Sequence, residues 1–502
     1  MPAELRFGTA GLRGPVRDGP GGMNVELVSR ATWAVAQWLS GRGLTGAPVA
    51  VGCDARHGSA EFFTTTTEML AAAGFDVIAL PGTSPTPLVA FACRDLDAAA
   101  AVQITASHNP AGDNGYKLYA GTGSDVPGAQ IVSPVDEEIE ALMARAPSTI
   151  PRSPVQPDDR AHTCRDRYLA RLSARFPRCT YPLRIALTPM HGVGGPLALD
   201  ALACAGFDDV HVVDAQFAPD PDFPTVAFPN PEEPGATDLL VRLAADVDAD
   251  VAIALDPDAD RCAVAVPADG GWRRLTGDEV GAVLCQALAA PGSVVASSIV
   301  SGTLAADVAE AAGARSVRTL TGFKWLARAG EPLVYAYEEA IGHCVDPDAV
   351  RDKDGISAAV LVARVVAELR RGGSSIGALL DGLAVRHGLH VTVGTSTRLP
   401  DPDEAAALMK RLRSTPRRTL AGLDCTMSDF AARTDGLRTD AVEFTGARGG
   451  ERIRAIVRPS GTEPKVKAYV EVVTSVGSAS EAAQRRATTL ERAQHAADDL
   501  LT

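Results

Sequence analysis

A serine in a short polar segment is the first candidate for chemistry in this sequence. Thr105-Ala106-Ser107-His108-Asn109-Pro110 follows the apolar run 98–104. A strand that ends here would display the Ser107 hydroxyl on an exposed turn, where it can act as a nucleophile. A turn capped by Ser and Asn would explain the same residues without any chemistry. Neighbouring residues on a strand point to opposite faces, so we do not assume that His108 activates Ser107.

A second segment carries three carboxylates at alternate positions, Asp256, Asp258 and Asp260, directly after an apolar run typical of a buried strand. Clustered negative charges cost energy unless a cation neutralises them. Oxygen ligands without His or Cys indicate Mg²⁺ or Ca²⁺ and argue against Zn²⁺. An EF-hand is not expected, because Arg261 stands where that loop needs Gly and Pro267 where it needs Glu. A solvated acidic turn remains the alternative, although ligands gather at strand ends in open α/β sheets.

Two further segments suit the binding of a phosphosugar. Arg458-Pro459-Ser460-Gly461-Thr462-Glu463-Pro464-Lys465 combines an arginine with hydroxyls and a glycine, which together can form an anion-binding turn. Turn formation alone would explain Pro, Ser and Gly, but not the flanking basic residues in so acidic a chain. Tyr337-Glu338-Glu339-Ala340-Ile341-Gly342-His343 is preceded by Thr321-Gly322-Phe323-Lys324-Trp325. Carboxylates and an imidazole on such loops suit vicinal sugar hydroxyls, although acids on surface loops are common without that role.

The elements that must position these segments repeat along the chain. Three times an apolar strand leads into an Ala-rich helix, then a glycine, then another strand. The expected strands are 48–53 and 76–80, then 183–187 and one through Val213, then 293–300 and 314–320, with Gly74, Gly206 and Gly313 after the helices. Left-handed backbone costs glycine nothing just past a helix. The repeats predict an α/β fold with mixed, largely parallel sheets and helices on both faces, unless Ala-rich segments resemble one another by chance.

The repeat ends before the carboxy-terminal part of the chain. Strands are expected there at 389–397, 441–445, 452–457 and 466–474, with helices at 402–413 and 480–500, which predicts a smaller α+β domain. Proline-rich stretches mark a linker at 147–157 and a long loop at 219–234. The predicted domains are 1–150 with the serine segment, 160–276 with the acidic segment, 277–388 with the Glu339 segment and 389–502 with the Arg458 segment.

Composition excludes several classes of protein. A chain of 502 residues is too long for one efficient core, so three or four domains are expected. Hydrophobic residues make up 46% of the chain, and the formal net charge of -14 disfavours nucleic acid or an anionic membrane surface as a partner. Nine cysteines lie singly, as expected for thiols in a reducing compartment. No signal-like or membrane-spanning stretch is present in the sequence, so a cytoplasmic protein is expected.

Taken together, the four segments resemble the α-D-phosphohexomutase family, which includes phosphoglucomutases and phosphomannomutases. Phe7-Gly8-Thr9-Ala10-Gly11-Leu12-Arg13-Gly14 is similar to the family's amino-terminal signature, and the other segments follow in the family's order. The resemblance implies three related α/β domains and a smaller fourth domain around a central cleft. It also implies a phosphorylated Ser107, Mg²⁺ held by that phosphate and the three aspartates, and a sugar 1,6-bisphosphate as activator. The bisphosphorylated sugar would turn round before it returns its other phosphoryl group.

The resemblance further implies a role for individual side chains. The residues implied at the transfer centre are Ser107, Lys117, Arg13, His108 and Arg261, and those that would bind the substrate are Lys324, Glu339, His343, Arg458, Ser460, Gly461 and Thr462. Among them, Lys117 is our candidate for proton transfer. The Arg458 segment would hold the phosphate that is not being transferred.

One departure from the family pattern leaves the sugar open. Many hexose mutases carry Met-Ser where this chain has Ala340-Ile341. The segments 221–224, 229–233 and 322–325 look like the branch that contains phosphoglucomutases and phosphopentomutases. The expected activity is interconversion of hexose 1-phosphate and hexose 6-phosphate, of glucose or mannose, with phosphopentomutase activity on ribose or deoxyribose phosphates as the alternative. A small-molecule sugar phosphate is the expected partner, and a monomer and a dimer both stay open.

Three other classes of function are alternatives to this prediction. A phosphatase of the haloacid dehalogenase type also presents Asp-x-Asp after an apolar strand, and Asp256 would be its nucleophile. That hypothesis leaves Ser107 and the Arg458 segment without a role, and it predicts release of inorganic phosphate. A sugar-phosphate-binding protein without catalysis would bind ligand while Ser107 accepted no phosphoryl group. A serine hydrolase needs a His with a carboxylate partner near Ser107, which sequence cannot place.

Overall fold

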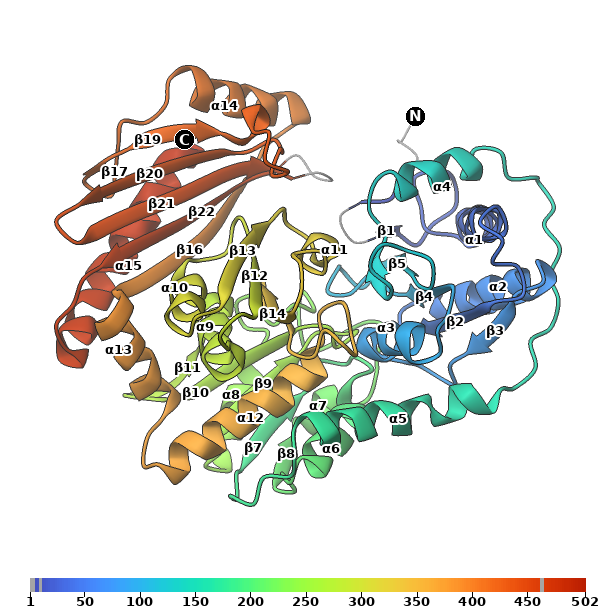
Figure 1. Cartoon of the computed structure of the whole chain (residues 1–502), viewed down its shortest axis with the longest axis horizontal. Coiled ribbons are helices and arrows are strands. Elements are labelled where there is room, and N and C mark those ends of the chain that lie inside the picture. Colours follow the sequence, from blue (N-terminus) through green and yellow to red (C-terminus); the bar gives the residue numbers. More distant parts are fainter. Residues whose placement is uncertain (1–4, 9–10, 461–464) are drawn as a thin grey trace.

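The computed structural model describes residues 5–8, 11–460 and 465–502 and contains four larger sheets, each covered by helices (Figure 1). The first three sheets are mixed and largely parallel at their centres, and the fourth is antiparallel. The predicted fold class is therefore confirmed. We propose that the domain limits predicted from the sequence apply to the folded chain. Among the described residues, no helix combines the length and the apolar character needed to cross a membrane.

The first sheet has the strand order β1-β5-β4-β2-β3, and β6 pairs with β5. Its strands are β1 (Leu12–Pro15), β2 (Pro48–Cys53), β3 (Asp76–Ala79), β4 (Ala100–Ile104), β5 (Asp113–Ala120) and β6 (Ala129–Gln130). Its helices are α1 (Val25–Ser40), α2 (Ser59–Ala72), α3 (Thr86–Asp95) and α4 (Val135–Met143). Strand β2 runs parallel to β3 and β4, whereas β5 is antiparallel to β1 and β4. The turn between β4 and β5 carries Ser107.

The second sheet has the order β11-β10-β9-β7-β8. It is built from β7 (Ile185–Thr188), β8 (Val210–Val212), β9 (Val251–Leu255), β10 (Cys262–Ala268) and β11 (Gly271–Arg274), with α5 (Asp159–Arg175), α6 (Gly195–Cys204), α7 (Asp214–Phe217) and α8 (Asp238–Asp246). The acidic segment joins β9 to its antiparallel neighbour β10. Every residue of β9 is buried, which explains why this strand is apolar throughout.

The third sheet has the order β13-β12-β14-β15. It contains β12 (Val294–Ser298), β13 (Arg315–Thr319), β14 (Leu333–Glu338) and β15 (Gly342–Cys344), with α9 (Gly277–Leu288), α10 (Leu304–Ala311), α11 (Phe323–Leu326), α12 (Gly355–Arg371) and α13 (Ile376–His387). The Glu339 segment is the tight connection between β14 and β15. The glycines that follow α2, α6 and α10 in the three repeats have positive φ, as predicted: Gly74 (86°), Gly206 (99°) and Gly313 (76°).

The fourth sheet has the order β16-β22-β21-β20-β19, and its neighbours are antiparallel throughout. Its strands are β16 (Leu389–Arg398), β19 (Thr426–Asp429), β20 (Val442–Arg448), β21 (Glu451–Pro459) and β22 (Lys465–Thr474), accompanied by α14 (Pro402–Ser414), α15 (Ala479–Leu501), the short 3₁₀ helix η1 (Phe430–Ala432) and a small ribbon of β17 (Thr419–Leu420) and β18 (Leu423–Asp424). The hairpin between β21 and β22 carries the Arg458 segment.

One continuous hydrophobic core connects the first three sheets. It contains side chains from α3, from α5 and α6, and from α12. The ring of Phe91 on α3 meets the ring of Tyr168 on α5 edge-to-face, with centroids 5.5 Å apart. Because close-packed interiors transmit displacement, this shared core fixes the serine turn of the first sheet relative to the acidic turn of the second. The fourth sheet has a core of its own.

A buried histidine attaches the fourth sheet to α10. His390 Nδ1 lies 2.8 Å from Glu471 Oε1, and its Nε2 lies 3.4 Å from Asp307 Oδ2. Burial alone would lower the pKa of His390, but the hydrogen bonds to Asp307 and Glu471 raise it to about 9. The folded protein therefore holds this proton more tightly than the unfolded chain, by roughly 3 kcal/mol.

This contribution to stability is complete below the ordinary histidine value of 6.5 and is lost as the pH rises through about 9. We expect the melting temperature of the protein to fall between about pH 7 and about pH 9.5, and His390→Gln to have a lower melting temperature with a flatter pH dependence. Thermal unfolding at several pH values measures both. Equal slopes for the two proteins would contradict the assignment of this proton to His390.

Candidate active site

Ser107 lies in the turn after β4 and is only 1% exposed. Its Oγ donates a hydrogen bond to Asp256 Oδ2 at 2.9 Å, which brings together residues of the first and second sheets. Its main-chain N–H donates to Thr105 Oγ1 at 2.9 Å, and its φ is 54°. Positive φ is uncommon outside glycine, and strained backbone of this kind concentrates at functional sites. The turn therefore presents the serine hydroxyl directly to the acidic loop.

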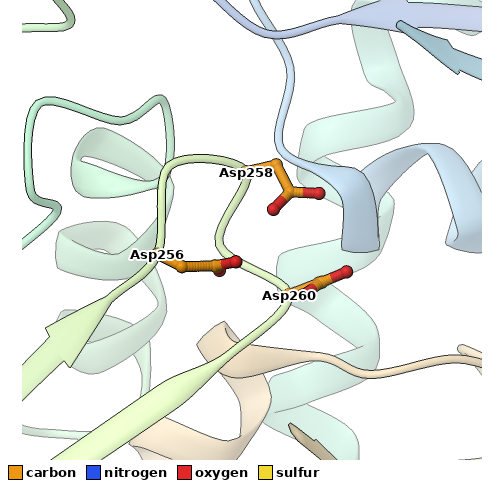
Figure 2. Close-up of side chains that lie close together, drawn as sticks. All are labelled: Asp256, Asp258 and Asp260. Carbon is orange, nitrogen blue, oxygen red and sulfur yellow. The ribbon is translucent and has the colours of Figure 1, made fainter. Parts of the chain in front are cut away.

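The acidic loop gathers Asp256, Asp258 and Asp260 in one place, as Figure 2 shows. All three residues are completely buried, and one oxygen from each lies within 4.8 Å of the others. The Oδ1 atoms of Asp258 and Asp260 are buried without a hydrogen-bond partner in the described part of the chain. Buried carboxylate oxygens without partners are costly unless a cation binds them. A set of hard oxygen donors with free lone pairs fits Mg²⁺.

Two lysines approach this loop from other sheets. Lys117 on β5 is completely buried, and its Nζ lies 2.6 Å from Asp258 Oδ2 and 2.7 Å from Asp260 Oδ2. Lys353, just before α12, places its Nζ 3.3 Å from Asp260 Oδ2. Burial alone would raise the pKa of Asp258, but the Lys117 ammonium lowers it below its ordinary value. Burial and the neighbouring Asp258 and Asp260 charges raise the pKa of Asp256. Asp256, the partner of Ser107, therefore binds a proton more readily than Asp258.

Arg261, Arg13 and His108 surround the same loop. Arg261 Nη1 donates to Ala340 O at 2.8 Å, and its main-chain N–H donates to Asp256 Oδ1 at 3.0 Å. Burial lowers the pKa of His108 well below its ordinary value, and the nearby Arg261 and Arg13 charges lower it further. His108 is consequently neutral at physiological pH. Its Nδ1 and the Nε of Arg13 are buried without a hydrogen-bond partner among the described residues.

The Glu339 loop lies beside the acidic loop, because Arg261 and Gly342 form a bridge between the second and third sheets. Glu339 Oε2 accepts hydrogen bonds from Ser298 Oγ at 3.0 Å and from Ser301 Oγ at 2.9 Å. A Cβ atom at Gly277 would lie 1.9 Å from the carbonyl oxygen of Glu339, so only glycine fits there. A cavity of about 510 Å³ opens at this loop, and its walls include residues 230–233, Glu339, Lys465 and Lys467. Three sheets therefore contribute to one polar cavity.

Two of the expected sugar contacts are not found at this cavity. His343 is completely buried in β15, where it pairs with Tyr337 and its Nδ1 lies 2.8 Å from the Tyr335 hydroxyl. Strand pairing thus turns its ring into the core of the third sheet. Lys324 on α11 points toward α4 of the first sheet, with its Nζ 3.9 Å from Asp136 Oδ2. In this arrangement His343 packs in the core next to the Glu339 loop, and Lys324 connects the third sheet to the first.

The Arg458 segment faces the third sheet. Arg458 Nη1 donates to Thr321 Oγ1 at 2.6 Å, and Arg458 pairs in register with Lys467. The main-chain N–H of Ser460 donates to Lys465 O at 2.7 Å. Gly461 and Thr462 lie outside the described residues. The described part of the segment therefore brings basic side chains of the fourth sheet to the loop that precedes α11.

The comparisons with known proteins agree with this geometry along the whole chain. Four consecutive profiles of phosphoglucomutase/phosphomannomutase match residues 4–149 (alpha/beta/alpha domain I), 166–270 (domain II), 276–385 (domain III) and 398–488 (C-terminal domain). The chain belongs to this family. It is a phosphosugar mutase, an intramolecular phosphotransferase of the α-D-phosphohexomutase type, and its buried aspartate triad is consistent with the family's metal site.

Relatives of this phosphosugar mutase carry more than one substrate name. The probable phosphomannomutase of Haemophilus influenzae is 40% identical over 90% of this chain and 93% of its own length. The probable phosphoribomutase of Schizosaccharomyces pombe is 35% identical over 94% of this chain and 87% of its own length. A crystal structure of a family protein from Burkholderia thailandensis has a TM-score of 0.73 and 20% identity over 99% of this chain and 98% of that one. That last similarity supports the fold alone.

Sequence reasoning missed two residues of the mutase site. Thr86, at the start of α3, donates its hydroxyl to Asp258 Oδ2 at 2.5 Å and its main-chain N–H to Asp258 O at 2.9 Å. Lys353 contacts Asp260 from the third sheet. Lys353 stands in a run of alternating charges, Arg351 to Asp354, directly before an apolar helix, and such a run beside an apolar helix is a signal that sequence reasoning can use. A single threonine such as Thr86 carries no comparable signal.

Proposed function

We propose that this mutase interconverts hexose 1-phosphate and hexose 6-phosphate, of glucose or mannose, through a phosphorylated Ser107 and a bisphosphorylated sugar. The observation that carries the proposal is the Ser107 hydroxyl, held 2.9 Å from Asp256 inside a buried triad of carboxylates. The identity with a probable phosphomannomutase supports a hexose substrate. A phosphoryl group on Ser107 would lie beside the three carboxylates and beside the basic side chains whose positive charges balance the charge of the phosphate.

The chain's own residues account for the bonds and the protons of a balanced phosphoryl exchange. The bond between phosphorus and Ser107 Oγ breaks as a sugar hydroxyl oxygen bonds to phosphorus. We assign the proton exchange to Lys117, which is buried within the site: its ammonium gives a proton to the departing Ser107 Oγ and takes up the proton that the sugar hydroxyl releases. Arg261 and Arg13 stabilise the negative charge that spreads over the transferring group, because fixed cations in a buried site need no reorganisation. In the second half-reaction the other phosphate returns to Ser107 and the proton is restored to the sugar.

Asp256, Asp258 and Asp260, together with the phosphate on Ser107, would hold Mg²⁺. When bound there, Mg²⁺ supplies Lewis-acid stabilisation of phosphoryl oxygens. We further propose that the Arg458 segment, including Ser460, Gly461 and Thr462, holds the phosphate at the far end of the sugar. A sugar 1,6-bisphosphate would then act as the activator, because it can phosphorylate a free Ser107.

Phosphopentomutase activity is the second candidate. The identity with the probable phosphoribomutase of Schizosaccharomyces pombe and with human phosphopentomutase, 32% identical over 95% of this chain, favours it. The Ala340-Ile341 pair also lacks the hydroxyl that many hexose mutases carry in this loop. A pentose phosphate and a hexose phosphate present the same phosphate chemistry to Ser107, so the Glu339 loop must discriminate between the two sugars.

Side-by-side turnover of glucose 1-phosphate, mannose 1-phosphate and ribose 1-phosphate tests the proposal. Each assay contains Mg²⁺ and a trace of the matching sugar bisphosphate, and both the isomer and free phosphate are measured. We expect isomer without free phosphate, with the highest kcat/KM for a hexose. The highest kcat/KM for ribose 1-phosphate would move the assignment to a phosphopentomutase. Release of phosphate without isomer would favour a phosphatase with Asp256 as nucleophile.

Replacement of Glu339 by glutamine should weaken the sugar contact more than the metal site. The carboxylate faces the cavity, and removing its charge leaves Ser298 and Ser301 with a poorer acceptor. We expect KM for the preferred sugar phosphate to rise about tenfold, the effect of one hydrogen bond to a charged group. The Mg²⁺ concentration that gives half-maximal activity should stay unchanged. A change in that concentration with KM unchanged would contradict the placement of the sugar at this loop.

A further inference from the structure

One buried arginine contacts the whole turn that carries Ser107. Arg56 follows β2 and is 4% exposed. Its Nη2 donates to Ser107 O at 2.6 Å and to Asn109 O at 2.7 Å, and its Nη1 donates to Pro110 O at 2.8 Å and to Asp113 O at 3.1 Å. Three main-chain carbonyls of the turn and that of Asp113, the first residue of β5, therefore converge on one guanidinium.

The arginine is itself held on two sides. Asp54 Oδ1 accepts hydrogen bonds from the main-chain N–H of Arg56 at 3.0 Å and from Ser59 Oγ at 2.6 Å. Asp54 Oδ2 lies 3.4 Å from Arg56 Nε. On the other side, the ring of Phe223 lies 5.0 Å from Arg56 Cζ, and Phe223 is 3% exposed. Phe223 comes from the proline-rich loop 219–234 of the second sheet, whose residues 230–233 line the cavity at Glu339.

The geometry of the turn explains why it needs such support. Ser107 has a φ of 54°, and strained backbone persists only where its surroundings over-determine it. A planar guanidinium presents several donors in a fixed fork and can satisfy four carbonyls at once. A lysine ammonium is a point charge with three donors on one atom, so it cannot reproduce this pattern.

We propose that Arg56 is the positioning residue of the phosphoserine turn. With Phe223 packed against its guanidinium, Arg56 fixes the direction in which Ser107 Oγ points toward the acidic loop. The inference rests on the proposed function, because it assigns the turn a precise geometry for phosphoryl transfer. Arg56 acts through the main chain of the turn and contacts neither the sugar nor the transferring group.

Three variants test the proposal: Arg56→Gln, Arg56→Lys and Phe223→Leu, the last of which keeps the arginine. The matched control is Arg94→Gln, because Arg94 also donates to two main-chain carbonyls, those of Asp348 and Pro127, at a distance from the serine turn. For each protein we would measure kcat and KM, and the rate at which Ser107 is phosphorylated by the sugar bisphosphate, followed by intact mass. Melting temperatures show which variants remain folded.

We expect Arg56→Gln to lower kcat and the Ser107 phosphorylation rate about 10²-fold, the usual cost of a misplacement near 1 Å, with KM little changed. Arg56→Lys and Phe223→Leu should lie between this variant and the wild type. Arg94→Gln should keep the wild-type kcat. A folded Arg56→Gln variant with wild-type kcat, or with a loss in KM alone, would overturn the proposal.

Hydrogen exchange tests the positioning role of Arg56 independently of the proposed mutase activity. Exchange of the main-chain amides of residues 107–109 and 111–113 should be faster in Arg56→Gln than in the wild type, whatever the enzyme's substrate. Unchanged exchange would overturn the positioning role even if the wild type proved to be an active mutase. Conversely, a wild type without mutase activity would refute the proposed function, while faster exchange in the variant would still support the role of Arg56 in the turn.

Discussion

Replacement of Ser107 by alanine is expected to lower mutase turnover at least about 10⁴-fold, because the alternative is direct attack without a covalent carrier. The change removes one hydroxyl and its hydrogen bond to Asp256, so the fold should lose only about 1 kcal/mol of stability. Intact mass should show no phosphoryl group gained on incubation with sugar bisphosphate. Steady-state turnover and melting temperature measure the two effects separately.

The matched control is Ser124→Ala, in the turn after β5, where the hydroxyl donates to Gly121 O at 2.8 Å. This variant removes the same group from the same sheet and should keep wild-type turnover. If Ser107→Ala retained substantial mutase activity, Ser107 would not be the phosphoryl carrier. The aspartate nucleophile of a phosphatase would then become the stronger alternative.

Replacement of Asp258 by asparagine is expected to lower kcat about 10³-fold at saturating Mg²⁺, since it removes one of three carboxylates around the transferring group. The Mg²⁺ concentration required for half-maximal activity should rise as well. The effect is large because Asp258 also accepts hydrogen bonds from Lys117 and Thr86, so the substitution weakens the contact between the loop and the first sheet as well. Activity titrated with Mg²⁺ after treatment with a chelator measures both changes.

Asp246→Asn is the control for this variant, because Asp246 is an exposed residue at the end of α8 in the same domain. It should titrate with Mg²⁺ as the wild type does. In addition, Mg²⁺ should raise the melting temperature of the wild type, because a ligand that binds only the folded state stabilises it by mass action. A wild type that is fully active without any divalent cation would contradict the metal assignment.

Some elements follow from sequence because they are local. The predicted strand 48–53 has the same limits as β2, and the apolar run before the acidic segment forms β9, since both runs are buried on both faces and bounded by turn residues. The predicted helices 402–413 and 480–500 differ from α14 and α15 by one residue at their ends. Side-chain periodicity and turn residues suffice for such elements.

The contacts that sequence could not predict join segments that lie far apart in the chain. Ser107 and Asp256 lie 149 positions apart, and only the packing of two sheets brings them together. Sequence could not predict that the side chain of His343 is buried in the third sheet, because β15 has only three residues, too few for a periodic pattern. The role of Arg56 could not be predicted either, because its partners are main-chain carbonyls, which every residue of any sequence carries.

We propose that Ser107 carries a phosphoryl group between the two ends of one sugar. The most direct test is to phosphorylate the enzyme with a labelled sugar bisphosphate, remove the excess, and add the preferred sugar monophosphate. We predict one phosphoryl group per chain on Ser107, followed by quantitative transfer of the label to the sugar as bisphosphate and isomer. Label that appeared as inorganic phosphate, or an enzyme that took up no label while it turned over substrate, would contradict the account.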